Sequence, residues 1–323
     1  MSDQSNNLSA NDPHLDLQTA RNILRGQAAT LPVIVDLAER LKKEKRFGYA
    51  RQLLARARSN PADVPADLRL YLGQQHALCT YKDTHLPVDQ RYADALKILN
   101  EVEDLRLTRN QETLGLAGAI YKCKWDTFGQ EPDLELSADY YLRGYAEGVR
   151  QDLGYTGVNA AFVLDLLASQ EAVQASRAGA APETAVQRRE KAKAIREDLV
   201  KVLAPLADDP TQPLLARNWW FLATVAEAYF GLGDYDQARA WILRARDQAK
   251  PADWELESTL RQLAKLARLR AAAGQIAAED MENSPGWQVL AAIAGPDKTA
   301  GVRGALIGRV GLALSGGGFR AAL

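Results

Sequence analysis

The chain has 323 residues, of which 47% are hydrophobic, so it can bury a substantial core and form one or two domains. Its 40 lysines and arginines against 41 aspartates and glutamates give a net charge of −1, which provides no bulk field to attract nucleic acid or an anionic membrane. The two cysteines, Cys79 and Cys123, form no C-x-x-C pattern and the three histidines are scattered, so we expect no disulfide framework, no metal, no cofactor and a reducing compartment.

The N-terminal segment is polar. Residues 1–14 contain no apolar stretch of the kind that forms a signal peptide, and we expect them to be disordered. No apolar run in the sequence approaches the roughly 20 residues needed to span a bilayer. Both observations predict a cytoplasmic protein. Residues 15–27 are predicted to form a helix that caps the apolar end of a helical array.

The first clear repeat covers residues 31–64, whose sequence is LPVIVDLAERLKKEKRFGYARQLLARARSNPADV. Its length of about 34 residues is the period of the tetratricopeptide repeat, a pair of antiparallel helices. Leu37 and Ala38 occupy the positions of the repeat's Leu-Gly pair, and Pro61 closes the second helix. Small residues let the paired helices approach, and large ones fill the groove to the next pair. In the second helix these positions hold Phe47, Ala50, Leu54 and Ala57.

A second copy of the same register lies near the other end of the chain, in residues 219–251. Gly233 and Asp234 form the expected turn between its two helices, and Pro251 ends the second one. The small and aromatic positions recur at Ala226, Tyr229, Tyr235, Ala238 and Ala245. Two separated copies in register predict an all-α solenoid of tetratricopeptide type over residues 15–273.

Degenerate helix pairs fill the region between the two copies. We expect helices over residues 67–80 and 91–99 with a long linker at 82–89, then 111–125 and 134–149, then 156–170 and 184–206, and finally a terminal helix over 252–273. The segment 176–183 is rich in small residues, which predicts a mobile linker. The basic run 188–196 alternates with glutamate, which is typical of a solvated helix face.

The middle of this solenoid also resembles a known regulatory domain. Three blocks occur in order, GAIYKCKWD at 118–126, ADYYLRGY at 138–145 and YTGVNAA at 155–161. They are similar to the G-R-I-Y-K-D, W-Y-R-K-G-F and Y-S-G-I-N-L-A blocks of the TRAFs-binding domain of apoptosis signal-regulating MAP kinase kinase kinases. The departures are Ala119 in place of the family arginine and an insertion of residues 123–125. The resemblance implies a helical domain with a regulatory role, of the kind fused to effector enzymes as a sensor of nucleotide-type signals.

Four polar residues in these blocks are candidates for a ligand site. Two interpretations are open for Tyr121, Lys122, Arg143 and Asn159. They belong either to a solvated helix face, with Asn159 bonding a neighbouring turn, or to a ligand pocket on the concave side of the solenoid. The register of Ala117 and Gly118 in the first helix places Lys122 on the concave side.

The last residues change character. Residues 274–308 show no long helical period and are predicted to be a connector with one short helix over 287–294. Residues 309–323 contain an apolar run of strand length, then Gly316, Gly317 and Gly318, then the start of a helix. One interpretation of the three glycines is a flexible turn or a cloning remnant. A Walker A loop is excluded because no G-K-[ST] follows.

The motif LALSGGGFRAAL at 312–323 closely resembles the opening of patatin-like phospholipases. The resemblance implies a β-strand and an oxyanion loop, Gly316 to Arg320, in which the N–H groups of Gly317, Gly318 and Phe319 hold the oxyanion and Arg320 supports the loop. The family's catalytic serine, in G-x-S-x-G, and its aspartate are expected beyond residue 323. No G-x-S-x-G occurs in the chain, so we expect these residues alone to hydrolyse no lipid.

These observations predict a regulatory sensor or protein-interaction module that controls a patatin-like serine acyl hydrolase. The expected partners are a protein or peptide, or a nucleotide-type ligand, on the concave face, with a lipid as substrate of the hydrolase and no nucleic acid. Such a protein would be peripheral at the membrane once its hydrolase domain is included. The alternative is a pure scaffold that grips a peptide or self-associates into a homo-oligomer and senses no small molecule.

Overall fold

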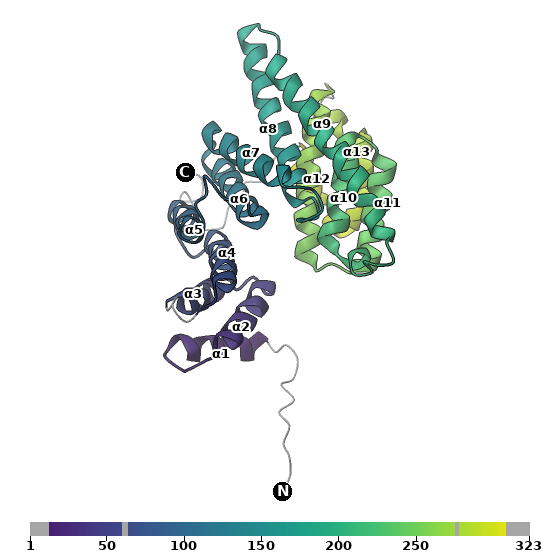
Figure 1. The fold of residues 1–323 in the computed structure, drawn as a ribbon. Helices are drawn as coiled ribbons and strands as arrows, with labels where there is room; N and C mark the ends of the chain where they lie inside the picture. Colours follow the sequence, from purple (N-terminus) through teal and green to yellow (C-terminus); the bar gives the residue numbers. More distant parts are fainter. Residues whose placement is uncertain (1–12, 60–63, 275–277, 308–323) are drawn as a thin grey trace, which may run out of the picture. The chain divides into compact units, whose positions relative to one another are not determined.

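The computed structural model describes residues 13–59, 64–274 and 278–307, and all regular structure in this part of the chain is helical. The helices form two compact units, residues 1–140 and 141–323, called unit 1 and unit 2 (Figure 1). Helix pairs follow one another along the chain in both units. The prediction of an all-α, tetratricopeptide-like solenoid is thereby confirmed for the described residues.

Unit 1 is built from consecutive antiparallel helices. α2 packs on α3, α3 on α4, α4 on α5 and α5 on α6, while α1 covers α2 and α3 as the predicted N-terminal cap. Only the first ten residues of α7 belong to this unit. The bounds are α1 Pro13–Leu24, α2 Leu31–Lys43, α3 Phe47–Arg58, α4 Ala66–Lys82, α5 Val88–Val102, α6 Gln111–Phe128 and α7 Glu131–Ala146.

The first repeat packs as its sequence predicts. Leu37 and Ala50 are fully buried, and Leu54 is 1% exposed, so α2 and α3 meet through one large and one small row of side chains. In the next pair Leu72 and Gly73 of α4 occupy the Leu-Gly positions of the repeat pattern. A Cβ atom at Gly73 would lie 2.5 Å from a methyl group of Val102, so glycine there sets the spacing of α4 and α5.

Unit 2 contains the end of α7 and the remaining helices. α10 packs on α9, α11 and α12, and α12 packs on α8 and α13. The bounds are α8 Tyr155–Ala178, α9 Glu183–Leu203, η2 Ala204–Asp208, η3 Leu215–Arg217, α10 Trp219–Leu232, α11 Tyr235–Ala249, α12 Asp253–Ala273, η4 Ala278–Asn283 and α13 Pro285–Ile307.

The predicted turn between α10 and α11 has the expected geometry. Gly233 ends α10 in the left-handed conformation, with φ 86°. The next residue, Asp234, begins α11, and its side chain accepts a hydrogen bond from the backbone N–H of Gln237 at 3.1 Å. Gly233, which has no Cβ, and the capping carboxylate of Asp234 therefore let the chain reverse direction within two residues.

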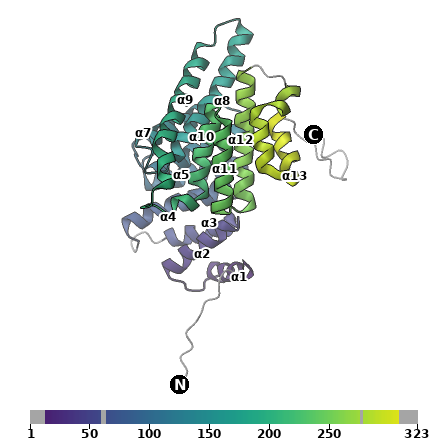
Figure 2. The ribbon, with the colours of Figure 1, turned by 90° about the vertical axis from the view of Figure 1, so that its right-hand side faces the viewer.

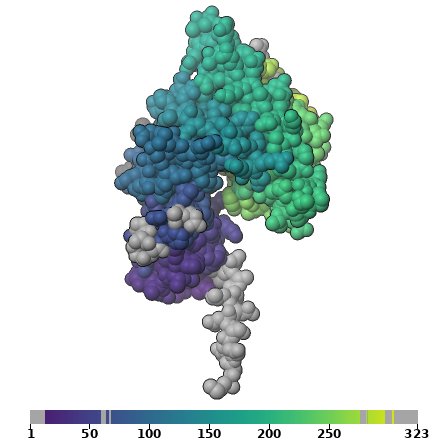
Figure 3. Space-filling model, viewed as in Figure 1, coloured from purple at the N-terminus to yellow at the C-terminus, as the bar shows by residue number. Residues whose placement is uncertain are grey.

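α8 and α9 form a long hairpin whose far end projects from the rest of unit 2 (Figures 2 and 3). The sequence predicted a linker over 176–183, but α8 continues to Ala178 and only four residues, 179–182, join it to α9. Alanine and arginine at 175–178 are good helix formers, so the small residues extend the helix up to Gly179. Gly179 then ends it with φ 65°.

The predicted connector is also more helical than expected. α13 spans Pro285–Ile307, well beyond the short helix predicted at 287–294. Its helical geometry is broken once, at Gly295 (φ 70°, ψ 172°), because the following Pro296 disfavours the helical conformation in the residue before it. The first half packs against α12 and buries Leu290 and Ile293. The predicted β-strand and oxyanion loop at 309–323 lie outside the described residues.

The prediction about the basic run of α9 is wrong at one residue: Glu190, Lys191 and Lys193 are exposed as expected, whereas Arg196 is not. The basic run 188–196 was expected to form a solvated face, but Arg196 is only 2% exposed and forms an ion pair with Asp165 of α8 at 2.6 Å. Arg196 stands four residues after Ala192 and three before Leu199, both fully buried. Arg196 therefore lies on the apolar face of α9 that packs against α8, and this position buries its side chain despite its charge.

None of the described helices is both long enough and apolar enough to serve as a membrane span.

Candidate functional site

The first helices of unit 1, α2, α4 and α6, are joined to one another by polar side chains. Tyr71 of α4 donates a hydrogen bond to Glu39 of α2 at 2.5 Å, and Lys42 of α2 donates to Gln75 of α4. Further along, Gln74 of α4 donates to Thr113 of α6 at 3.0 Å. First helices line the concave surface of such repeats. We call the surface formed by their polar residues, together with Lys45 of the turn after α2, the inner face: Glu39, Lys42, Lys45, Tyr71, Gln75, Lys82 and Glu112.

The inner face carries charges of both signs, and Lys42 pairs with Glu39 one turn earlier on α2 at 2.6 Å. Near the start of α4, burial and the hydrogen bond to Glu39 raise the pKa of Tyr71, and the charge of Glu112 on α6 contributes further. At the other end of α4, Lys82 lies within electrostatic range of Lys42 and Lys45. Three ammonium groups thus gather where α2 and α4 end, and we call Lys42, Lys45 and Lys82 the basic end.

Lys82 is exposed, as is Lys45, whereas Lys42 is half-buried. The ammonium group of Lys82 lies 5.7 Å from the centres of the Phe47 and Tyr81 rings, and it forms no ion pair among the described residues. Desolvation by the surrounding protein lowers the pKa of Lys82, although its side chain is exposed. A cation that water reaches and that forms no ion pair among the described residues is available to attract an anion.

Two thiols lie close to this cation. Cys79 is fully buried, and burial raises the pKa of its thiol to about 12. Cys123 of α6 is half-buried, and burial again raises its pKa, while the nearby charges of Lys122 and Lys82 oppose that change. Both thiols are therefore protonated at neutral pH and add little charge to the basic end.

His76 of α4 lies away from the inner face and contributes to packing. Its Nδ1 accepts a hydrogen bond from Arg58 of α3 at 2.8 Å, and Arg58 also pairs with Glu101 of α5 at 3.0 Å. Burial, followed by the charge of Arg58, lowers the pKa of His76 to about 3. The imidazole is therefore neutral in the folded protein at pH 7 and links three helices.

Two of the residues predicted from the sequence, Tyr121 and Lys122, lie near the end of α6. The Tyr121 ring stacks on Tyr140 of α7 at 5.6 Å between centroids, and the Lys124 ammonium lies 5.0 Å above it. Lys124 also pairs with Asp133 at 2.7 Å, so Tyr121 is part of the joint between α6 and α7. Lys122 is half-buried and adjacent to Cys123 on the same helix.

The other two predicted residues, Arg143 and Asn159, belong to unit 2. Arg143 is half-buried near the end of α7. Asn159 is 6% exposed, and its side-chain amide donates to the carbonyl of Tyr155 one turn earlier, at 2.9 Å. That bond matches the structural interpretation of Asn159. Tyr121 and Lys122 belong to unit 1 and Arg143 and Asn159 to unit 2, and the assignment of the four residues to a ligand stays a prediction.

Sequence reasoning missed the basic end. The predicted first helix stopped at Thr80, two residues short of Lys82. A signal was present: Tyr71, Gln75, Leu78 and Lys82 recur at helical spacing, which marks one face of α4. The contribution of Lys42 and Lys45 depends on how α2 docks on α4, and one helix alone does not reveal it.

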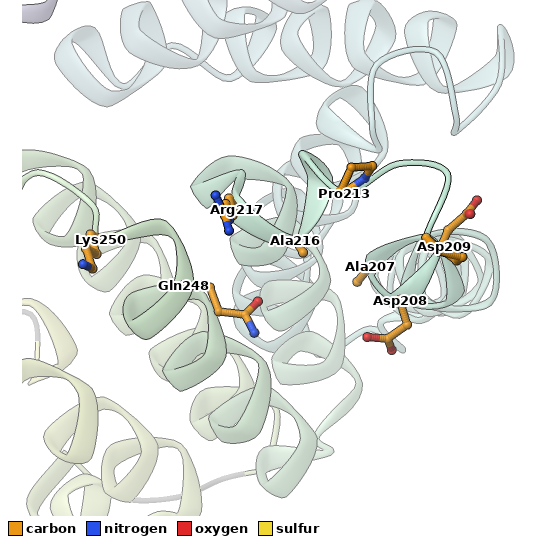
Figure 4. A pocket seen from close by; sticks show the side chains of 9 residues that line it. Ala207, Asp208, Asp209, Pro213, Ala216, Arg217, Gln248 and Lys250 are labelled. Atoms are coloured by element: carbon orange, nitrogen blue, oxygen red, sulfur yellow. The ribbon is translucent and has the colours of Figure 1, made fainter.

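Unit 2 contains a pocket, shown in Figure 4. It has a volume of about 780 Å³ and opens where η2, η3 and their connecting loop meet the end of α11. Its lining combines small apolar residues with charged ones: Ala207, Asp208, Asp209, Pro210, Pro213, Ala216, Arg217, Gln248 and Lys250. The volume is in the range of small-molecule sites.

The predicted oxyanion residues, Gly316, Gly317, Gly318, Phe319 and Arg320, lie outside the described residues, and their role stays a prediction. Within the described part of the chain, no three histidine, cysteine or carboxylate side chains are grouped as a metal site requires.

Comparison with known proteins supports the repeat assignment. No curated protein and no solved structure matches the chain. One family model does match, over residues 46–164, from the residue before α3 into α8. This segment includes α4 and α6 of the inner face, together with Lys82. Residues 46–164 are therefore similar to the family described as Tetratricopeptide Repeats-Sensor.

Proposed function

We propose that the chain is a regulatory sensor module whose inner face binds an anionic ligand. The match of residues 46–164 to a sensor-type repeat family supports a regulatory protein-interaction module. Repeats of this kind bind partners on the surface lined by their first helices. The observation that carries the proposal is the basic end, where Lys82 is exposed and forms no ion pair among the described residues.

The chemistry of the inner face favours phosphate or carboxylate groups. A phosphate brought to Lys82 gains a charge-assisted hydrogen bond, and the neighbouring Lys45 adds attraction, whereas the charge of Lys42 is offset by its ion pair with Glu39 at 2.6 Å. Two sources supply such a group. A nucleotide-type signal is the ligand in the sensor interpretation, and an acidic peptide segment is the ligand in the scaffold interpretation.

The first prediction separates these sources. Calorimetric titration with ATP, with NAD⁺ and with a decaglutamate peptide is expected to show saturable binding of at least one probe. Lys82→Glu should weaken that binding by roughly tenfold or more, because a charge-assisted bond contributes about 1.5–3 kcal/mol. Because the pKa of Lys82 is lowered, this side chain loses its positive charge at a lower pH than an ordinary lysine does. The affinity for the anion should therefore begin to decline at a lower pH than the usual pKa of lysine predicts.

The matched control is Lys97→Glu, which makes the same charge change at an exposed position of α5. It should leave the affinity unchanged within about twofold, the effect of a remote surface charge. Nucleotide binding supports the sensor, and binding of the peptide alone supports the scaffold. The proposal fails if no probe binds, or if both variants weaken binding equally.

We further propose that the regulated activity is a patatin-like serine acyl hydrolase. The support is the sequence of residues 310–323, in which an apolar run is followed by three glycines and, two residues later, Arg320. Such a loop stabilises an oxyanion only when a serine nucleophile lies beside it. Control of this hydrolase by the inner face is the regulatory step.

The second prediction tests the hydrolase alone. A protein extended beyond residue 323 is expected to contain G-x-S-x-G at a strand-to-helix turn and to react with a serine-directed phosphonate probe. The 323-residue chain should not be labelled, because it contains no G-x-S-x-G. Labelling of the shorter chain, or an extension without such a serine, would remove the hydrolase assignment and leave the repeat module untouched.

A further inference from the structure

The pocket of unit 2 combines an apolar lining with an uneven distribution of available charge. Its wall includes Pro210, Pro213 and Ala216 from the loop between η2 and α10, with the buried Ala207 beside them. In Figure 4, Gln248 and Arg217 lie between Lys250 on one side and the two aspartates on the other. Four side chains at the pocket are charged, two positive and two negative.

The two carboxylates are already engaged within the protein. Asp208 pairs with Arg244 of α11 at 2.8 Å, and Arg244 also donates to the carbonyl of Ala207 at 3.0 Å. Asp209 accepts from the backbone N–H of Thr211 at 2.8 Å and from its hydroxyl at 2.6 Å. These bonds lower the pKa of Asp209. Both carboxylates therefore serve to fix the loop that forms the pocket wall.

The two cations remain available. Arg217 ends η3 and Lys250 follows α11, and both side chains are exposed at the pocket. Neither forms an ion pair or a side-chain hydrogen bond among the described residues. The backbone of Lys250 adopts φ 47° at the end of α11, and its N–H donates a hydrogen bond to the carbonyl of Arg246. The charge that the pocket can offer to a ligand is therefore positive.

We propose that this pocket binds a small organic anion, with its phosphate or carboxylate between Arg217 and Lys250 and its apolar part against Pro213 and Ala216. The guanidinium fork can donate two parallel hydrogen bonds to two oxygens of either anionic group. The volume of about 780 Å³ accommodates more than a bare ion, and the proline and alanine surface favours an apolar body. The site is separate from the inner face, which belongs to unit 1.

The third prediction uses ligand-observed ¹⁹F NMR with 4-fluorophenyl phosphate, 4-fluorobenzoate and the neutral 4-fluorobenzyl alcohol. The two anions are expected to show saturable broadening, and the alcohol should bind at least tenfold more weakly. Arg217→Ala and Lys250→Ala should each weaken anion binding by about tenfold, the effect of losing one charge-assisted bond. Stronger binding of the phosphate or of the benzoate identifies which anion the site prefers.

Three further variants make the result specific. Arg239→Ala removes an exposed cation of α11 that does not line the pocket, and it should leave binding intact. Arg217→Lys keeps the charge and should retain part of the affinity. Lys82→Glu should change nothing here, so failure of the inner-face proposal and failure of this one are distinguishable. Equal binding of the alcohol, or equal losses in Arg239→Ala and Arg217→Ala, would overturn the proposal.

Discussion

Replacing Asp165 by alanine is expected to destabilise the protein by about 3–5 kcal/mol, because the change leaves a buried guanidinium without its counter-charge. Asp165 of α8 lies 2.6 Å from Nη2 of Arg196, whose side chain is 2% exposed. The Nε atom of Arg196 is buried and has no acceptor, so the ion pair is the main compensation for the buried charge. Equilibrium urea unfolding, compared at the transition midpoint, measures the loss.

Two companion variants identify the cause of that loss. Glu197→Ala breaks the exposed pair between Lys193 and Glu197 on the same helix, and it should cost less than about 1 kcal/mol. The double variant Asp165→Leu with Arg196→Met should recover most of the stability, since packed apolar side chains can replace a buried ion pair. A loss in Asp165→Ala no larger than that in Glu197→Ala would contradict the buried-charge account.

The ion pair also shows where sequence reasoning about the fold reaches its limit. Hydrophobic periodicity and the repeat register predict most helices because small and large residues such as Ala50 and Leu54 recur at the spacing that packing requires. Arg196 was misassigned because its charge was given more weight than its helical position between Ala192 and Leu199. The helical spacing already places Arg196 on the buried side of α9. Its partner, Asp165, lies 31 positions earlier, and only the folded hairpin brings the two together.

The candidate sites, too, could be predicted from the sequence only in part. The face of α4 that carries Lys82 can be predicted from spacing, whereas the approach of Lys42 and Lys45 depends on how α2 docks on α4. The pocket of unit 2 depends on a loop whose shape is fixed by Asp208 and Asp209. Such loop contacts have no period in the sequence. The ligand assignment of Tyr121 and Asn159 stays a prediction: the ring of Tyr121 stacks on Tyr140, and the side chain of Asn159 bonds the carbonyl of Tyr155.

Replacing Gly73 by alanine is the second change with a large expected effect. Alanine favours an isolated helix over glycine by about 1 kcal/mol, so propensity alone predicts a gain in stability. The structure predicts the opposite. An added Cβ would lie 2.5 Å and 2.8 Å from the two methyl groups of Val102 and 3.1 Å from its Cβ. Helices α4 and α5 would have to move apart, at a cost of about 1–3 kcal/mol.

A double-mutant cycle with Val102→Ala assigns the effect to this contact. Val102→Ala removes the two methyl groups that the new Cβ would meet, so Gly73→Ala should cost little or even stabilise in that background. Urea unfolding of the four proteins gives the coupling, which should amount to about 1 kcal/mol or more in favour of the double variant. Additive losses would show that the spacing of α4 and α5 is set elsewhere. A positive coupling would instead establish Gly73 as the residue that lets α5 approach α4, the helix that carries Lys82.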